Sequence, residues 1–118
     1  MYKEQILDLY RKPRKEGTLE TDYRAEGENK SCGDHTEIFL EIEDKHIEKV
    51  RHQTDGCAIC TAAASITSEE IEGEDVGKVE DLDRDWIIDK LGTDISPMRV
   101  KCAVLGLKTT QEILKNSD

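Results

Sequence analysis

An alternating pattern near the middle of the chain constrains the fold most strongly. Apolar and polar residues alternate over Thr36–Glu43, Asp44-Lys45 supplies a turn, and a second run extends from Ile47 to Asp55-Gly56. Alternation with a period of two is typical of a strand that has one buried and one solvated face. The sequence therefore predicts an antiparallel hairpin over these residues.

Helical patterns flank this hairpin. The predicted elements are a helix from Tyr2 to Arg11 that is stopped by Pro13, a short irregular strand over Tyr23–Glu28, a helix from Gly56 to Glu72-Gly73, a helix capped by Asp83 or Asp85 and closed by Gly92, and a final helix or helix pair that begins at Ser96-Pro97. This order predicts an α+β fold with a small antiparallel three-stranded sheet and helices packed mainly on one face. The length of 118 residues predicts a single domain over 1–118.

Charge and hydropathy exclude several functional classes. The chain has 27 acidic and 17 basic residues, a net charge of −10, and no basic stripe, which argues against nucleic-acid binding. No apolar run approaches the roughly 18 residues of a membrane span, and the start Met1-Tyr2-Lys3-Glu4 lacks the apolar core of a secretory signal. We therefore expect a cytoplasmic protein, whose cysteines are metal-binding or reactive thiols rather than disulfides.

Three of the four cysteines stand where a loop is expected to meet regular structure. At these positions, Cys32, Cys57 and Cys102, we expect exposed side chains, and a helix N-terminus would lower the thiol pKa. Cys60 forms a Cys-x-x-Cys pair with Cys57, which would suit a metal knuckle or a redox dithiol. Because Cys60 lies one turn into a helix among small residues, we expect it to be buried.

The cysteine motifs and their order resemble a known family. The motifs are Cys32-Gly33-Asp34, then Gly56-Cys57-Ala58-Ile59 followed by Ala62–Ser65, then Arg99–Leu105 around Cys102, with 24 and 44 residues between the three cysteines. The chain is similar over nearly its whole length to iron–sulfur cluster assembly scaffolds of the IscU/SufU type, which are related to the N-terminal domain of NifU.

The resemblance implies a scaffold or carrier rather than an enzyme. Such a protein accepts sulfur from a cysteine desulfurase of the IscS, NifS or SufS type, binds iron, and assembles a labile cluster that it transfers to apo iron–sulfur proteins. The expected cluster is [2Fe-2S], with [4Fe-4S] as an alternative. By the same resemblance Cys32, Cys57 and Cys102 are cluster ligands and candidate sulfur acceptors. Asp34 is the fourth ligand or a carboxylate that tunes the lability of the cluster, and Lys101 is an auxiliary residue that could pair with Asp34.

Zinc and a sulfurtransferase activity remain open at this stage. Three cysteines and one aspartate suit tetrahedral Zn²⁺, so a zinc-dependent sulfurtransferase similar to SufU is the alternative function. However, the gap before Cys102 leaves no room for the insertion that SufU-type proteins carry there. The segment 95–101 departs from the docking sequence of bacterial IscU, so a dedicated chaperone is not expected. Cys60 could add a fourth thiolate or take a redox or sulfur-relay role.

Other polar and aromatic residues receive structural interpretations. We expect His35 to point away from the ligands, His46 and His52 to be solvated strand positions, and Trp86 to anchor the core. A thioredoxin-like oxidoreductase is disfavoured because no strand precedes the Cys-x-x-Cys pair within a βαβ unit. Metal binding can supply folding free energy, so we expect zinc or a cluster to raise the melting temperature.

Overall fold

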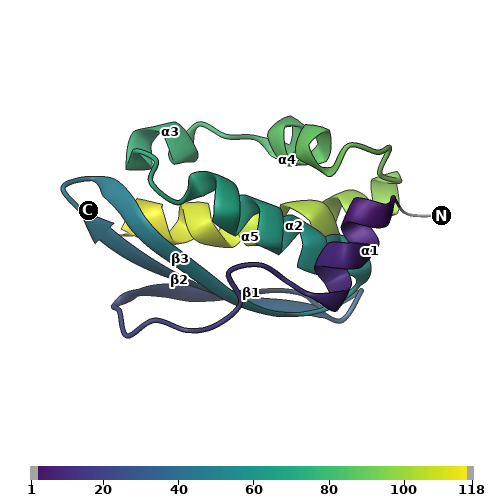
Figure 1. The fold of residues 1–118 in the computed structure, drawn as a ribbon, viewed down its shortest axis with the longest axis horizontal. Coiled ribbons are helices and arrows are strands. Elements are labelled where there is room, and N and C mark those ends of the chain that lie inside the picture. Colours follow the sequence, from purple (N-terminus) through teal and green to yellow (C-terminus); the bar gives the residue numbers. More distant parts are fainter. Residues whose placement is uncertain (1–2, 117–118) are drawn as a thin grey trace.

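The computed structural model describes residues 3–116 and forms an α+β fold, as predicted (Figure 1). The elements, in chain order, are α1 (Glu4–Arg11), β1 (Tyr23–Asn29), β2 (Asp34–Glu43), β3 (His46–Asp55), α2 (Ala58–Ile71), α3 (Val76–Glu80), α4 (Arg84–Leu91) and α5 (Pro97–Asn116). The predicted first helix began at Tyr2, which lies outside the described residues.

The three strands form one antiparallel sheet in the order β1-β2-β3. Asn29 pairs with Asp34 at one end of the β1–β2 ladder, and Leu40 pairs with Val50 in the β2–β3 ladder. The β2–β3 turn holds Asp44 at φ 51° and Lys45 at φ 64°, and two consecutive left-handed residues match the twist of a two-residue hairpin. β2 begins at Asp34, two residues earlier than the alternation predicts, because its first residues still pair with β1.

The helices cover one face of the sheet in two layers (Figure 1). α2 and α5 pack directly on the strands and against each other, whereas α1 packs on α2, and α4 packs on α2 and α5. A Cβ atom at Gly106 of α5 would lie 3.3 Å from the Cα of Ala64 in α2. The small residues of α2 therefore permit the close helix approach, as the sequence predicts.

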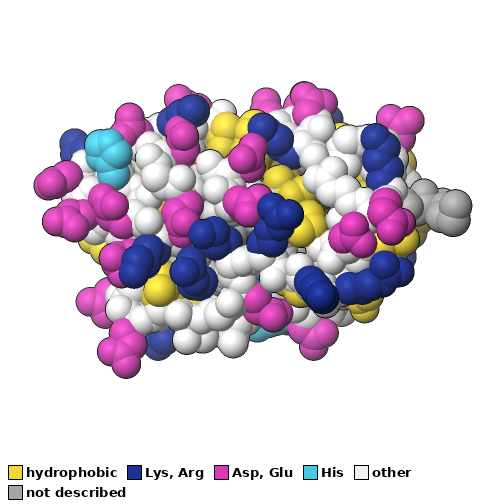
Figure 2. Space-filling model, viewed as in Figure 1, with side chains coloured by type: hydrophobic (Ala, Val, Ile, Leu, Met, Phe, Trp, Pro, Cys, Tyr) yellow, Lys and Arg dark blue, Asp and Glu magenta, His cyan; other side chains and the backbone are white. Residues whose placement is uncertain are grey.

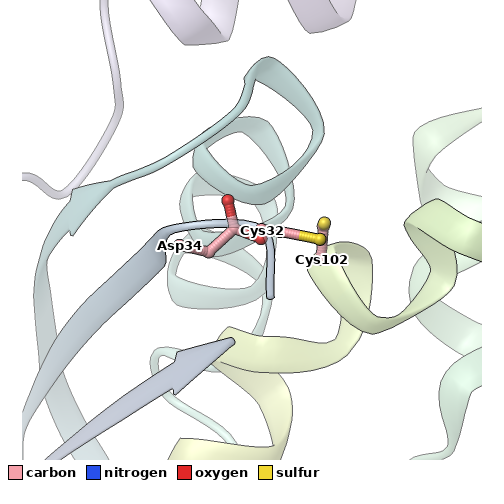
Figure 3. Close-up of side chains that lie close together, drawn as sticks. All are labelled: Cys32, Asp34 and Cys102. Atoms are coloured by element: carbon pink, nitrogen blue, oxygen red, sulfur yellow. The ribbon is translucent and has the colours of Figure 1, made fainter. Parts of the chain in front are cut away.

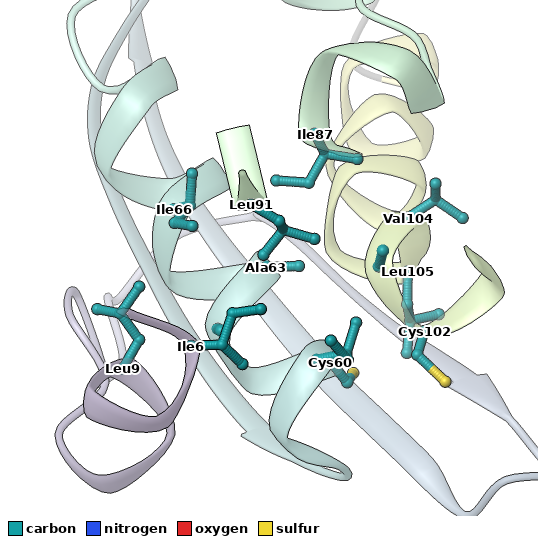
Figure 4. Packing of buried hydrophobic residues seen from close by; sticks show 13 residues of the cluster. Ile6, Leu9, Cys60, Ala63, Ile66, Ile87, Leu91, Cys102, Val104 and Leu105 are labelled. Carbon is teal, nitrogen blue, oxygen red and sulfur yellow. The ribbon is translucent and has the colours of Figure 1, made fainter. Parts of the chain in front are cut away.

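The buried apolar side chains form two clusters. The first lies between α1, α2, α4 and the first half of α5, and it includes Cys60 and Cys102 (Figure 4). The second lies between the sheet and the far ends of α2 and α5, and Ile38, Leu40 and Val50 contribute to it. Because two of the four cysteines belong to the first cluster, the candidate site borders directly on the core.

Trp86 packs against both clusters as a partly buried side chain, which agrees with its predicted anchoring role. α5 is one continuous helix of 20 residues, and α3, which the sequence did not predict, has only five. Among the helices of residues 3–116, none is long and apolar enough to cross a membrane. Acidic and basic side chains intermix on the face shown in Figure 2, and some form ion pairs, such as Arg14–Glu69 at 2.9 Å.

His52 is buried, so its prediction as a solvated residue is wrong. The segment after α1 pairs with the outer edge of β3, because the Gly17 N–H donates to the His52 carbonyl and the His52 N–H donates to the Lys15 carbonyl, each at 2.9 Å. The imidazole then lies beneath this segment, where its Nε2 donates to the Arg14 carbonyl at 2.9 Å and its Nδ1 contacts Thr54 Oγ1 at 2.8 Å. Burial lowers the pKa of His52, so the ring is neutral at pH 7.

Candidate metal-binding site

Three segments that are distant in sequence meet at one end of the sheet. They are the loop after β1, which carries Cys32, the first residue of β2, Asp34, and the second turn of α5, which carries Cys102. The two Sγ atoms and a carboxylate oxygen of Asp34 all lie within 4.8 Å of one another (Figure 3). Two thiols and one carboxylate at this spacing could hold a single metal ion such as Zn²⁺ or an iron of a cluster.

The turn between β1 and β2 sets the direction of Cys32 and Asp34. The Cys32 and Gly33 N–H groups both donate to the Asn29 carbonyl, at 3.1 and 2.9 Å. Gly33 adopts φ +73°, a left-handed conformation that a residue with a Cβ rarely takes. The glycine of the Cys-Gly-Asp motif therefore lets the chain turn tightly enough to bring its two neighbours to one site.

The Asp34 carboxylate is buried, and both of its oxygens accept hydrogen bonds. Its Oδ1 accepts the Cys57 N–H at 3.1 Å and its Oδ2 accepts the Asn29 amide at 3.4 Å. Burial opposes the charged form, but hydrogen bonds from Cys102, Cys57 and Asn29 prevail and hold the pKa of Asp34 below its ordinary value. Asp34 is therefore an ionised and already oriented carboxylate that could serve as a metal ligand.

Gly56 provides the space that this carboxylate occupies. A Cβ atom at Gly56 would lie 2.6 Å from Asp34 Oδ1 and 3.2 Å from its Cγ. Only a glycine in front of Cys57 allows the aspartate to approach the start of α2 so closely. Gly56 and Cys57 of the second motif therefore help to position Asp34 of the first motif.

Cys57 lies beside the group of three rather than within it. It is half-buried as the N-cap of α2, and its Sγ accepts the Cys60 N–H at 3.5 Å. Its backbone N–H binds Asp34, and its thiol is close enough to Cys102 to influence that residue's pKa. A fourth donor is therefore adjacent to the other three, and all four predicted ligands lie at one end of the molecule.

Cys102 is buried, so the expectation of an exposed thiol is wrong for this residue. It stands on the second turn of α5, not at its start, and its side chain belongs to the first core cluster (Figure 4). Burial and the neighbouring Asp34 raise the pKa of Cys102, and burial likewise raises that of Cys60. Both thiols are protonated at neutral pH, and the predicted burial of Cys60, at 1% exposed, is confirmed.

Cys32 has the opposite environment, because it is exposed and faces a lysine. Lys101 Nζ donates to Ser31 Oγ, which in turn lies 3.9 Å from Cys32 Sγ. Desolvation raises the thiol pKa, but hydrogen bonds from Ser31 and Lys101 and the lysine charge together lower the pKa of Cys32 overall. Lys101 was expected to pair with Asp34; instead its charge acts on Cys32, and the charge that acts on Asp34 is that of Arg99.

Two residues of the site were missed by the sequence analysis. Ser31 lies between Lys101 and Cys32 and contacts both side chains. Asn29 joins the end of β1 to α5, because its side-chain amide donates to the Lys101 carbonyl at 3.0 Å. Their only sequence signal is a short polar side chain within the three residues before the Cys-Gly-Asp motif. His35, as expected, lies outside the group, and its Nε2 contacts Glu26 Oε1 at 2.9 Å.

Fold and site together define a class of small α+β proteins that present a thiol and carboxylate site at the end of a three-stranded sheet. The NifU-like N terminal domain family matches residues 1–117. The iron–sulfur cluster assembly scaffold protein IscU of Thermotoga maritima is 35% identical, over 98% of this chain and 93% of that protein. The chain therefore belongs to the NifU-like N terminal domain family.

Two further comparisons agree with this membership. The zinc-dependent sulfurtransferase SufU of Bacillus subtilis is 27% identical over 95% of this chain and 88% of that protein. A crystal structure from Fervidobacterium islandicum AW-1, described as an iron–sulfur cluster assembly scaffold protein for the SUF system, superimposes with a TM-score of 0.79 at 28% identity and covers 96% of each chain. These relatives represent the two functions that the sequence resemblance left open.

Proposed function

We propose that this protein is an iron–sulfur cluster assembly scaffold that accepts sulfur from a cysteine desulfurase and passes a labile cluster to apo-proteins. The observation that carries the proposal is the convergence of Cys32, Asp34 and Cys102 within 4.8 Å, with Cys57 adjacent. The family membership and the IscU relative support the same function. Iron and sulfide are the cargo of this site.

The donor set favours a cluster that can leave. Clusters that remain in electron-transfer proteins are usually held by four thiolates. Here one of the four proposed ligands is the Asp34 oxygen, which binds iron less strongly than a thiolate. We assign [2Fe-2S] as the cluster, because three thiolates and one carboxylate supply two ligands for each of two irons.

The exposed Cys32 is the first sulfur acceptor in this proposal. A donor can reach it from solvent, and its lowered pKa increases the fraction of thiolate at neutral pH. The thiolate is the form that attacks the persulfide of a desulfurase. Cys57 and Cys102 are less accessible, so they are acceptors only of sulfur that has already entered the site.

The proposed function is tested by anaerobic assembly. The reduced chain is incubated with a cysteine desulfurase, cysteine and ferrous iron, and the product is examined by Mössbauer spectroscopy and by transfer to an apo-ferredoxin. We expect a cluster that transfers fully. We expect Asp34→Ala to slow the transfer, because the exchangeable ligand is lost, whereas Asp81→Ala, an exposed carboxylate at the end of α3, serves as the control.

The zinc-dependent sulfurtransferase is the second candidate, and the SufU relative together with the four-donor set supports it. Cys32, Asp34, Cys57 and Cys102 would hold Zn²⁺, which would keep the bound thiols in the thiolate form that attacks the incoming sulfur. The sulfurtransferase function would be favoured over the scaffold function by two results together. They are tightly bound zinc that strongly stimulates desulfurase turnover, and no cluster formation in the presence of iron.

A further inference from the structure

Cys57 and Cys60 form a thiol pair that the assembly function does not require. Cys57 caps α2 with an extended backbone, at φ −70° and ψ 169°, and Cys60 stands at the third position of the helix. The Cys57 Sγ accepts the Cys60 N–H at 3.5 Å, so this sulfur lies over the residue that carries the second thiol. Cys57 is half-buried, whereas Cys60 lies behind it in the core.

The spacing of the pair permits a disulfide without movement of the helix. Residues three apart on a helix have Cα atoms about 5 Å apart, within the roughly 4.4–6.8 Å that a disulfide spans, but helical Cβ atoms at about 5–6 Å are farther apart than the roughly 3.5–4.5 Å of a disulfide. Cys57 is the N-cap and has an extended backbone, so a small adjustment of this residue, with the helix in place, brings the two Cβ atoms and then the sulfurs together. An accessible cysteine at a helix N-terminus with a shielded partner one turn later is also the arrangement of a dithiol that is oxidised and reduced in turn.

We propose that Cys57 and Cys60 act as an internal dithiol reductant, which converts sulfur carried on Cys57 into free sulfide. The inference rests on the proposed function, since sulfur that enters at Cys32 and passes to the adjacent Cys57 supplies the persulfide. In the reaction, the anionic terminal sulfur of the Cys57 persulfide first takes the proton of the Cys60 thiol, and the resulting Cys60 thiolate attacks Sγ of Cys57. A Cys57–Cys60 disulfide forms, the bond between Sγ and the terminal sulfur breaks, and the terminal sulfur leaves with the electron pair as hydrosulfide.

The electron balance of this step matches what a cluster needs. The terminal sulfur of a persulfide is reduced by two electrons to sulfide, and the two thiols supply both electrons as they become a disulfide. Each round leaves the chain oxidised, so an external dithiol of the thioredoxin class must regenerate the pair. Until that happens Cys57 cannot act as a cluster ligand, which makes ligand availability dependent on the reductant.

The position of the inner sulfur favours attack at Sγ rather than at the terminal atom. Sγ of Cys57 is held over residue 60 by the capping hydrogen bond, whereas a terminal sulfur attached to it would have no such contact with residue 60 to hold it. Attack at the terminal atom would only move the persulfide to Cys60 and release nothing. Hydrosulfide is a weaker base than an alkyl thiolate, and a weaker base leaves faster.

The experiment treats the full-length, metal-free, reduced chain with one equivalent of glutathione persulfide under anaerobic conditions without other reductants. Released sulfide is trapped with monobromobimane, remaining thiols are alkylated, and peptides are mapped by mass spectrometry. We expect the wild type to release one sulfide per chain and to contain a Cys57–Cys60 bridge. We expect Cys60→Ala to keep one extra sulfur on Cys57 and to release no more sulfide than Cys57→Ala, whereas Asp81→Ala, the exposed control outside the site, behaves as wild type.

Several outcomes would overturn the inference. The first is that Cys60→Ala releases as much sulfide as wild type, and the second is that Cys57 of Cys60→Ala carries no extra sulfur. The others are that the wild type forms a Cys57–Cys102 bridge or that the extra sulfur is found on Cys60. The bridge is mapped in the wild type itself, so the test does not depend on how a variant folds. If the bridge and sulfide appear with glutathione persulfide but a cysteine desulfurase loads no sulfur, the inference stands and the proposed sulfur donor is wrong.

Discussion

Substituting Gly56 by alanine tests the link between the second cysteine motif and Asp34. The added Cβ would lie 2.6 Å from Asp34 Oδ1, so the carboxylate must move. The backbone of Gly56 does not have a positive φ, so alanine strains nothing except this contact. A displaced carboxylate also loses the Cys57 N–H, which it now accepts at 3.1 Å.

The size of the effect follows from these two contacts. Overpacking costs about 1–3 kcal/mol, and a hydrogen bond to a charged group is worth about 1.5–3 kcal/mol. The same movement of the carboxylate relieves the overpacking and breaks the hydrogen bond, so the two costs do not add fully. We expect a loss of about 2–4 kcal/mol in the free energy of unfolding. At about 4 °C per kcal/mol for a chain of this length, the melting temperature falls by about 8–16 °C.

Two measurements on the Gly56→Ala variant test this reasoning. Thermal unfolding of the metal-free chain by circular dichroism gives the stability, and competition with a chromophoric chelator gives the zinc affinity. We expect the affinity to fall about 10- to 100-fold, as it does when ligand-orienting contacts are lost. Gly77→Ala is the matched control, because a Cβ at Gly77 would meet nothing within 4 Å.

An acid titration adds a further check. Because hydrogen bonds hold the Asp34 pKa low, their stabilisation is fully present above the pKa of the unfolded chain and is lost as the pH falls below it. Wild type and Gly56→Ala should therefore converge in acid. If the variant matches Gly77→Ala in melting temperature and zinc affinity, Asp34 neither fills this space nor acts as a ligand.

Three further changes have definite expected outcomes. His52→Leu leaves buried polar partners unpaired, so it should lower the free energy of unfolding, measured in urea at pH 8, by about 2–3 kcal/mol. The difference in stability between wild type and variant should narrow below about pH 6.5, because His52 of the wild-type chain takes up a proton on unfolding there. Gly106→Ala should lower the melting temperature, at a cost of about 1–3 kcal/mol, because its Cβ would crowd α2; an unchanged value would contradict the close helix packing. Lys101→Met should raise the pKa of Cys32 and slow its alkylation at pH 7, whereas Lys108→Met should not.

The sheet could be predicted from the sequence because its information is local. The alternation of Ile38, Leu40 and Ile42 specifies one buried face, and the turn at Asp44-Lys45 fixes the pairing of β2 with β3 next to the turn. The register shift between Glu41 and Ile42, which sets the pairing of the rest of the ladder, has no such local signal. The site residues were found for a different reason. Cys32, Asp34 and Cys57 belong to short motifs, each of which is contained in a single turn or helix start.

The errors in the sequence analysis arise where distant segments decide the environment. Cys102 is buried because the whole of α5 is oriented by its packing on α2 and the sheet, and a local pattern does not reveal that rotation. His52 is buried because the segment after α1 pairs with the free edge of β3. Likewise, Lys101 acts on Cys32 through Ser31, across 70 residues of sequence.

The division of the site between solvent and core gives a physical basis for reversible loading. Cys32 is exposed and tends toward the thiolate, so it can take up sulfur or metal without disturbing the fold. Cys102 is buried among apolar side chains with a raised pKa, so a metal must displace its proton before the thiolate can bind. Loss of the metal returns the proton and restores an uncharged thiol to the first core cluster. Binding through Cys102 is therefore opposed by the core, and affinity should decrease as the pH falls, which favours a site that releases what it assembles over one that retains it.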